Sequence, residues 1–287
     1  MSCVVCSRKA YGYTCQERMI LGIDVGGSTT KIVGFASKEN CIGMMQVEAK
    51  DQLTSAFGAF GKFVAAHSLK MQDIKQIVLT GVGASYLQGM YDIPTKRVDE
   101  FLAIGLGGLK MAGLDSAIII SVGTGTALVR ACGSDITHIG GSGVGGGTLQ
   151  KLANRFVGAS SFDSIIALAA QGDLSVVDLQ LGDISREKIG NLPPDTTVSN
   201  FGNLKDSATS ADIVRGLINM IFESVGMMAV FATLRDCISD VVLIGSLSVI
   251  DQAQDVLDTL SKMYPIRFHL PKDAIYATAV GAALSEF

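Results

Sequence analysis

A glycine-rich turn follows an apolar, strand-like run at two places in the chain, and the two places are alike. Residues 23–29 read IDVGGST and residues 120–126 read ISVGTGT, so four of the seven positions are identical. The segments lie 97 residues apart, which is far longer than the ~20–50 residues of a solenoid repeat. The repeat therefore predicts two related half-domains, each with a glycine turn at the end of a strand.

Apolar runs alternate with helical patterns along the rest of the chain. The runs that predict strands are residues 20–24, 31–36, 41–47, 74–80, 117–122 and 241–244. Apolar residues recur at helical spacing over residues 53–66, 100–112, 148–156, 211–234 and 249–262. Such alternation is typical of an α/β fold with a mixed sheet in each lobe. We expect an N-terminal extension over residues 1–18, a first lobe over residues 19–115 and a second lobe over residues 116–287.

Composition and charge exclude several classes of function. The net charge is −4 and no run of Lys and Arg occurs, so the chain lacks the basic surface of a nucleic-acid-binding protein. Hydrophobic residues make up 48% of the chain, which argues against intrinsic disorder. Six dispersed cysteines indicate free thiols in a cytoplasmic protein rather than a disulfide scaffold. Cys3, Cys6 and Cys15 have no fourth ligand nearby, so they do not predict a zinc site.

One apolar segment has the length of a membrane span. Residues 216–234 carry a single charge, on Glu223, and about 20 apolar residues can cross a bilayer as a helix. Arg215, Arg235 and Asp236 bracket the segment, and no other segment is like it. We therefore expect a long buried helix and no contact with a membrane.

Three glycine-rich turns, at residues 26–30, 123–126 and 140–147, suit the binding of phosphate groups. Without a Cβ atom in the way, backbone amides can approach an anion closely. Asp24 precedes the first turn, where a carboxylate can hold hydrated Mg²⁺ beside a polyphosphate, and Lys31 supplies a cation. The turns match neither the P-loop nor the dinucleotide-binding pattern, and each alone could be a simple hairpin. Together they predict a clamp for nucleotide phosphates between two lobes.

These motifs resemble those of a known superfamily. The segments GIDVGGSTTK, ISVGTGT and VVLIGS are similar to the two phosphate motifs and the adenosine motif of the acetate and sugar kinases, heat-shock chaperones and actin. The segments VDEFLAIGLGGL, IGGSGVGGGTLQKL and DTTVSNFG resemble the type II (eukaryotic-like) pantothenate kinases. The resemblance runs from about Met19 to the C-terminus. It implies an α/β fold with two lobes of duplicated actin-like (ribonuclease H-like) mixed-sheet architecture and ATP between them.

The resemblance also implies an activity, which is ATP- and Mg²⁺-dependent phosphorylation of pantothenate, the first step of coenzyme A synthesis. The resemblance further implies a cytoplasmic homodimer and feedback by coenzyme A or its thioesters. Glu100 falls at the position of the general base and Asp24 at that of the residue acting on Mg²⁺. The residues alone favour a first-turn carboxylate stabilised by the helix dipole, and the resemblance reverses that interpretation.

Further site residues follow from the same resemblance. The implied nucleotide-binding residues are Asp24, Gly26, Gly27, Ser28, Thr29, Thr30, Lys31, Thr124, Gly146, Gly147, Thr148, Leu149, Gln150, Phe162, Gly245 and Ser246. Gly146 and Gly147 open a helix, where free amides favour an anion. The implied substrate-binding residues are His138, Gly140 and Asp195.

Two positions depart from the family pattern. His138 stands where the family usually has an arginine that contacts the acid substrate, and a histidine lacks the permanent, forked charge of arginine. Phe162 stands where some bacterial relatives have a tyrosine, so a hydroxyl is lost and the ring is kept. These departures leave open a kinase for another small molecule, such as an amino sugar. Two alternatives belong to other functional classes. One is an ATPase that activates a partner enzyme, and the other is a nucleotide-binding regulator without catalysis.

Overall fold

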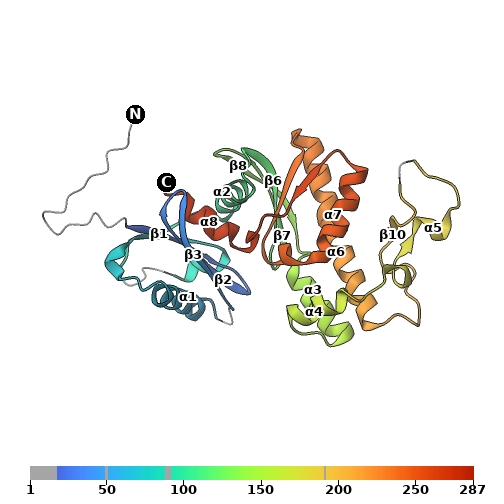
Figure 1. Ribbon diagram of the computed structural model, residues 1–287, viewed down its shortest axis with the longest axis horizontal. Coiled ribbons are helices and arrows are strands. Elements are labelled where there is room, and N and C mark those ends of the chain that lie inside the picture. The colour runs from blue at the N-terminus through green and yellow to red at the C-terminus, as the bar shows by residue number, and fades with distance from the viewer. Residues whose placement is uncertain (1–17, 49–50, 88–91, 191) are drawn as a thin grey trace, which may run out of the picture.

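Two five-stranded mixed sheets, with helices packed against them, make up the fold (Figure 1). The computed structural model describes residues 18–48, 51–87, 92–190 and 192–287. The α/β class and the mixed sheets predicted from the sequence are confirmed. The expected extension over residues 1–18 lies outside the described residues, apart from Arg18.

The first sheet has the strand order β3-β2-β1-β4-β5. Its strands are β1 (Met19–Val25), β2 (Thr29–Ser37), β3 (Asn40–Glu48), β4 (Ile74–Thr80) and β5 (Thr95–Arg97). Strands β1, β2 and β3 are antiparallel neighbours, whereas β4 runs parallel to β1 and β5 runs parallel to β4. Helix α1 (Gln52–Ala66) covers one face of this sheet, where Ile23, Phe60 and Ile77 are fully buried.

The second sheet repeats the arrangement of the first. Its strands are β6 (Ser116–Val122), β7 (Thr126–Cys132), β8 (Asp135–Ser142), β11 (Asp240–Ile244) and β12 (Arg267–His269), in the order β8-β7-β6-β11-β12. Strands β6, β7 and β8 are antiparallel, and β11 runs parallel to both β6 and β12. Strand order and directions thus agree between the two sheets, and the duplication predicted from the two glycine turns is present in the fold.

Four helices build the core on one side of the second sheet. They are α3 (Gly146–Val157), α4 (Phe162–Ala169), α6 (Ser210–Asp236) and α7 (Asp251–Met263). Among the described residues, α6 is the one helix long and apolar enough to cross a membrane, and 61% of its most apolar window is buried inside the protein. This burial agrees with the core helix expected there. Short 3-10 helices occupy Met71–Asp73, Val82–Tyr86, Leu174–Val176, Ser246–Val249 and Ala274–Tyr276.

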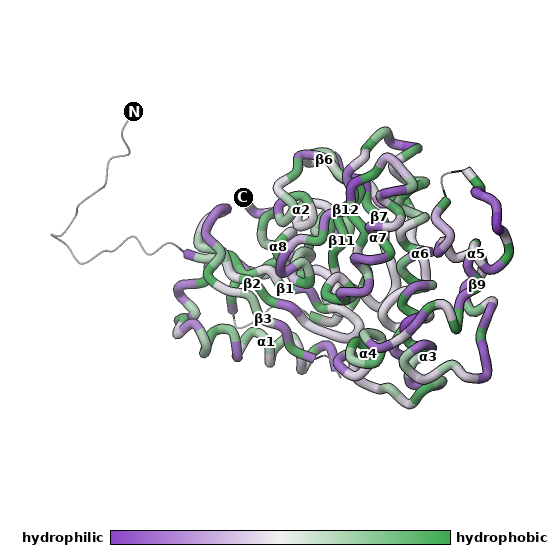
Figure 2. Tube along the Cα trace, turned by 45° about the vertical axis from the view of Figure 1, so that its right-hand side comes forward, coloured by the Kyte–Doolittle hydropathy of each residue, from purple (hydrophilic) through white to green (hydrophobic). Residues whose placement is uncertain are grey.

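A small unit projects beside α6, on the far side from the first sheet (Figures 1 and 2). It contains β9 (Leu179–Gln180), α5 (Leu181–Ile184) and β10 (Thr197–Ser199). Polar contacts fix it to α6. The amide of Asn219 donates to Asp178 Oδ2 at 2.8 Å, and the amide of Asn200 donates to Glu223 Oε2 at 2.8 Å.

Helices α2 (Glu100–Ala112) and α8 (Ala277–Leu284) pack directly against each other (Figure 1). Helix α8 also packs on β1 and β4, and α2 packs on β6, β7 and β8, so the pair joins the two sheets. A methyl group on Gly107 would overlap the carbonyl of Ala277, and one on Gly281 would overlap the carbonyl of Ala103. The two backbones therefore meet with no side chain between them.

The position of α8 bears on the predicted lobes. Its residues belong by number to the expected second lobe, 116–287, yet Ala279, Val280 and Ala283 pack with Ile20 and Val78 of the first sheet. The division at residue 115 stays a prediction. Wherever the boundary lies, the C-terminal helix α8 supplies part of the core of the first sheet.

Gly107→Ala should lower the free energy of unfolding by about 2 kcal/mol or more, because an added methyl in a packed contact forces the backbones apart. Urea unfolding followed by circular dichroism measures this change. Gly61→Ala in α1 is the matched control, since nothing lies within 4 Å of its Cβ position. That variant should gain up to about 1 kcal/mol from helix propensity. Equal stability of the two variants would contradict the backbone contact.

Candidate active site

Asp24 and Lys31 form a buried ion pair at the first glycine turn. Asp24 lies near the end of β1 and is paired in register with Lys31 of β2, so their side chains share a face of the sheet. Lys31 Nζ is 3.8 Å from Asp24 Oδ2, and both residues are buried. Burial raises the pKa of Asp24, and the Lys31 ammonium opposes that rise. The carboxylate keeps lone pairs for a further ligand.

Thr80 and Gly81 complete the surroundings of Asp24, and neither was predicted from the sequence. Thr80 lies beside Asp24 in the parallel pairing of β1 and β4. Its Oγ1 is buried and makes no hydrogen bond to any residue that the structure describes. Gly81 has a φ of 87°, and a methyl group there would lie 2.5 Å from Asp24 Oδ1. In the sequence, a polar residue followed by glycine at the end of a buried strand was the pattern that could have indicated these two site residues.

Glu100 is the first residue of α2, beside this ion pair. The helix is capped by Asp99, whose Oδ1 accepts a hydrogen bond from the Leu102 amide at 3.0 Å. Burial raises the pKa of Glu100 above its ordinary value of 4.5, and the negative charges of Asp24 and Asp99 raise it further, whereas Lys31 lowers it. Glu100 therefore lies within electrostatic reach of Asp24 and Lys31. A carboxylate with a raised pKa is a better proton acceptor near neutral pH.

The first two glycine turns face each other through Ser28 and Thr124, which are 96 residues apart in the chain. Ser28 Oγ is 3.4 Å from Thr124 Oγ1, and a methyl group on Gly27 would lie 3.3 Å from the same Thr124 oxygen. The first turn also closes the hairpin between β1 and β2, with the Gly26 amide donating to the Thr29 carbonyl at 3.0 Å. The first turn is therefore a hairpin turn. Its role in binding phosphate stays a prediction.

The third turn is docked onto the second. The Gly146 amide donates to the Gly123 carbonyl at 2.8 Å, and the Gly147 amide donates to the Thr124 carbonyl at 2.9 Å. The expectation that these two amides are free to bind an anion is therefore wrong, because backbone carbonyls occupy them. The start of α3 instead fixes the shape of the second turn.

Some predicted nucleotide-binding side chains point into the protein. Thr30 and Leu149 are fully buried, so neither residue exposes an atom to a nucleotide in this structure. Gln150 Nε2 donates to the Ser160 carbonyl at 3.1 Å, and Thr148 Oγ1 donates to the Gly143 carbonyl at 3.1 Å. The latter two side chains stabilise the loops around α3. A role in binding nucleotide stays a prediction for all four.

Phe162 packs against Gly146, and Gly245 packs against the end of β6. A methyl group on Gly146 would lie 3.4 Å from Phe162 Cζ and 3.3 Å from Leu247 Cδ2. Gly245 has a φ of 94°, and a methyl group there would lie 2.7 Å from the Val122 carbonyl oxygen. The predicted adenosine segment is therefore packed tightly against the end of β6.

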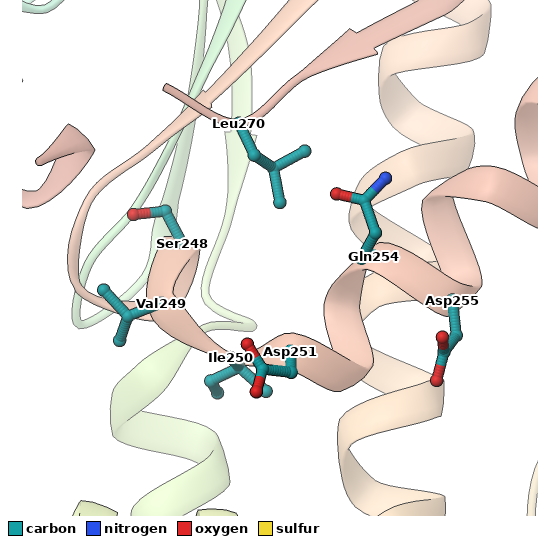
Figure 3. Close-up of a pocket in the computed structure, with 7 residues that line it drawn as sticks. All are labelled: Ser248, Val249, Ile250, Asp251, Gln254, Asp255 and Leu270. Carbon is teal, nitrogen blue, oxygen red and sulfur yellow. The ribbon is translucent and has the colours of Figure 1, made fainter. Parts of the chain in front are cut away.

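A cavity of about 490 Å³ lies where the chain continues past Gly245 and Ser246 (Figure 3). Its lining residues are Ser248, Val249, Ile250, Asp251, Gln254, Asp255 and Leu270. The lining combines three apolar side chains with four polar ones, three of which come from the start of α7. An apolar wall with a few polar groups is typical of small-molecule pockets.

The three predicted substrate-binding residues do not lie together. His138 stacks on Phe101, the neighbour of Glu100, and Gly140 is paired with Leu128 within the same sheet. Asp195 precedes β10 in the projecting unit, which both views place across α6 from α2 (Figures 1 and 2). The structure thus brings His138 close to Glu100, and it does not bring Asp195 there.

The described residues contain no group of three or more His, Cys, Asp or Glu side chains that could hold a metal ion. Cys3, Cys6 and Cys15 lie outside them. Asp24 offers one buried carboxylate, which suits Mg²⁺, because this ion usually keeps several waters and takes one or two carboxylates plus substrate phosphates.

Solved structures with the same architecture include proteins of several activities. Component A of (R)-2-hydroxyglutaryl-CoA dehydratase from Acidaminococcus fermentans superposes with a TM-score of 0.67 at 17% identity, covering 93% of this chain and 96% of that one. The activator of 2-hydroxyisocaproyl-CoA dehydratase from Clostridium difficile, with bound ADPNP, gives 0.66 at 16% identity and covers 93% of each chain. A ROK hexokinase from Thermus thermophilus gives 0.54 at 13% identity, covering 93% and 98%. At such identities these likenesses establish the fold.

Sequence comparison identifies the family. The Fumble family matches residues 116–281. The type II pantothenate kinase of Staphylococcus aureus is 31% identical over 237 residues, which cover 79% of this chain and 84% of that enzyme. The corresponding enzyme of Staphylococcus saprophyticus is 29% identical over 237 residues, covering 79% and 85%. The chain therefore belongs to the Fumble family of type II pantothenate kinases.

Proposed function

We propose that this protein transfers the γ-phosphoryl group of ATP to the primary hydroxyl of pantothenate, giving 4′-phosphopantothenate and ADP. The observation that carries the proposal is the meeting of the two glycine turns at Ser28 and Thr124, with Glu100 beside the Asp24–Lys31 pair. This arrangement places hydroxyls, a cation and a carboxylate near the meeting of the two turns, as phosphoryl transfer requires. The relatives' names supply the acceptor.

Glu100 is the proposed general base. As the acceptor oxygen forms its bond to the γ-phosphorus, the Glu100 carboxylate takes the hydroxyl proton, and the bond from the γ-phosphorus to the β,γ-bridging oxygen breaks to release ADP. The raised pKa of Glu100 suits this role, because the carboxylate holds the proton more firmly than an exposed one does.

The phosphates would lie between the first two turns. Lys31 contributes a positive charge, and Ser28 and Thr124 contribute hydroxyl donors. Asp24 would hold Mg²⁺, which when bound neutralises charge on the nucleotide phosphates. The adenosine would extend toward Gly245, Ser246 and the adjoining cavity.

The acceptor side and the assembly are further parts of the proposal. His138 and Gly140 would contact pantothenate. A homodimer could form through the outward face of α6, where Phe231 and Leu234 are exposed. A substrate contact by Asp195 stays a prediction, because the projecting unit lies across α6 from α2 (Figure 1). Feedback by coenzyme A or its thioesters and a cytoplasmic location are expected from the family.

The purified protein should release ADP from ATP only when pantothenate is present. A coupled ADP-release assay in Mg²⁺ buffer measures this, with an amino sugar and no acceptor as parallel reactions. Turnover of the amino sugar alone would move the assignment to another small-molecule kinase. ATP hydrolysis that ignores every acceptor would favour the ATPase alternative.

Glu100→Gln should lower kcat by at least about 100-fold, the usual contribution of a positioned base, while ATP binding by calorimetry stays within about twofold of the wild type. Glu187→Gln, an exposed glutamate in the projecting unit, is the matched control and should leave both quantities unchanged. A Glu100→Gln enzyme that retains its rate would remove Glu100 from the mechanism.

The pH profile of kcat/KM should report the environment of Glu100. A base must be ionised, so the rate should fall as the pH drops through the raised pKa of Glu100, above 4.5. Asp99→Asn removes one charge that raises this pKa and keeps an N-cap of equal quality. The acid limb of the variant should therefore move to lower pH, with the helix intact by circular dichroism. A limb that stays or moves upward would contradict the electrostatic assignment.

A further inference from the structure

The ring of Phe101 lies face to face with the imidazole of His138. The ring centroids are 4.0 Å apart and the planes are inclined by 16°. Phe101 follows Glu100 in the first turn of α2, and His138 lies in β8 of the second sheet. The stacked pair therefore joins the helix that carries the proposed base to the strand that carries a proposed substrate contact.

The local sequence explains why these two rings meet. Phe101 and Gly105 are four residues apart and share a helix face, and Ile136 and His138 are two residues apart and share a strand face. The Cβ position of Gly105 lies 2.7 Å from Ile136 Cγ2. Only a residue without a side chain permits this close approach of α2 to β8, and it brings His138 under Phe101.

The stack leaves the nitrogen-bearing edge of His138 free. His138 is exposed and makes no hydrogen bond or ion pair among the described residues, whereas Phe101 is half-buried and packs, like Ile136, against the core beneath α2. An exposed imidazole on a strand can adopt several rotamers. Contact with the anchored Phe101 ring selects one of them and holds the plane of the imidazole.

We infer that Phe101 is a positioning residue for substrate recognition, which fixes the imidazole of His138 so that its N–H edge meets the carboxylate-bearing acceptor beside Glu100. This inference rests on the proposed function. A neutral imidazole offers one N–H donor and one acceptor nitrogen, and a protonated imidazole offers two donors. Either form can bind a carboxylate oxygen, provided that the ring is held in place.

Steady-state kinetics on three variants test the inference. Phe101→Leu keeps apolar bulk and loses the ring, so the KM for pantothenate should rise about 3–10-fold, the range of one hydrogen bond, with kcat within about twofold. Phe101→Tyr keeps the ring and should resemble the wild type. Phe156→Leu makes the same change at an exposed site in α3 and should change neither constant.

A double-mutant cycle separates positioning from packing. His138→Ala should raise KM as Phe101→Leu does, and the double variant should be no worse than His138→Ala alone, because the two changes remove one interaction. Additive effects, or a loss confined to kcat, would overturn the inference, since Phe101 would then act on the helix or on Glu100.

Nuclear magnetic resonance gives a readout that does not depend on turnover. The ring protons of His138 should be shifted upfield by the Phe101 ring in the wild type and in Phe101→Tyr, and should return toward ordinary values in Phe101→Leu. Unchanged signals in Phe101→Leu would overturn the inference. Absence of pantothenate turnover by the wild type would instead reject the proposed function, and the His138 signals would still decide whether Phe101 holds the ring.

Discussion

The direct contact between the backbones of α2 and α8 sets the geometry on which the site depends. Helix α8 packs on the first sheet and α2 on the second, so their separation fixes the separation of the sheets. Gly107 and Gly281 allow the shortest separation, because neither places a side chain in the contact. Glu100 is the first residue of α2. The contact that joins the sheets therefore also places the proposed base relative to Asp24, which the first sheet carries.

Glycine serves two different purposes in the turns. In the first turn, the absence of a Cβ atom on Gly27 allows the turn to approach Thr124 of the second turn. At the start of α3 it lets Gly146 and Gly147 dock onto the second turn, and their amides are used in that docking. The glycines at the start of α3 thus join the third turn to the second, and anion binding by the first two turns stays a prediction. The hydroxyls of Ser28 and Thr124 meet between these turns, whereas the Gly146 and Gly147 amides are bonded to carbonyls.

Individual helices and strands could be predicted from the sequence, because each depends on a pattern of neighbouring residues. The elements that they pack against could not be predicted in this way. The apolar run over residues 20–24 and the helical spacing over residues 100–112 placed β1 and α2 closely. All eight residues of α8 are buried, so no polar face indicates which sheet the helix covers. The carbonyls that bond Gly146 and Gly147 lie more than twenty residues earlier in the chain. Asp195 was assigned from a short motif, which gives a residue type but not its place in space.

The fold alone leaves the chemistry open, since dehydratase activators and a ROK hexokinase share it. The surroundings of Glu100, the proposed base, bear on this choice. The N-terminus of a helix favours an ionised carboxylate, so a first-turn glutamate with only a structural role should have a lowered pKa. Here burial raises the pKa, the charges of Asp24 and Asp99 raise it further, and the charge of Lys31 lowers it. The base strength of Glu100 thus comes mainly from exclusion of water, and an acceptor seated against the Phe101–His138 pair would exclude still more water from it.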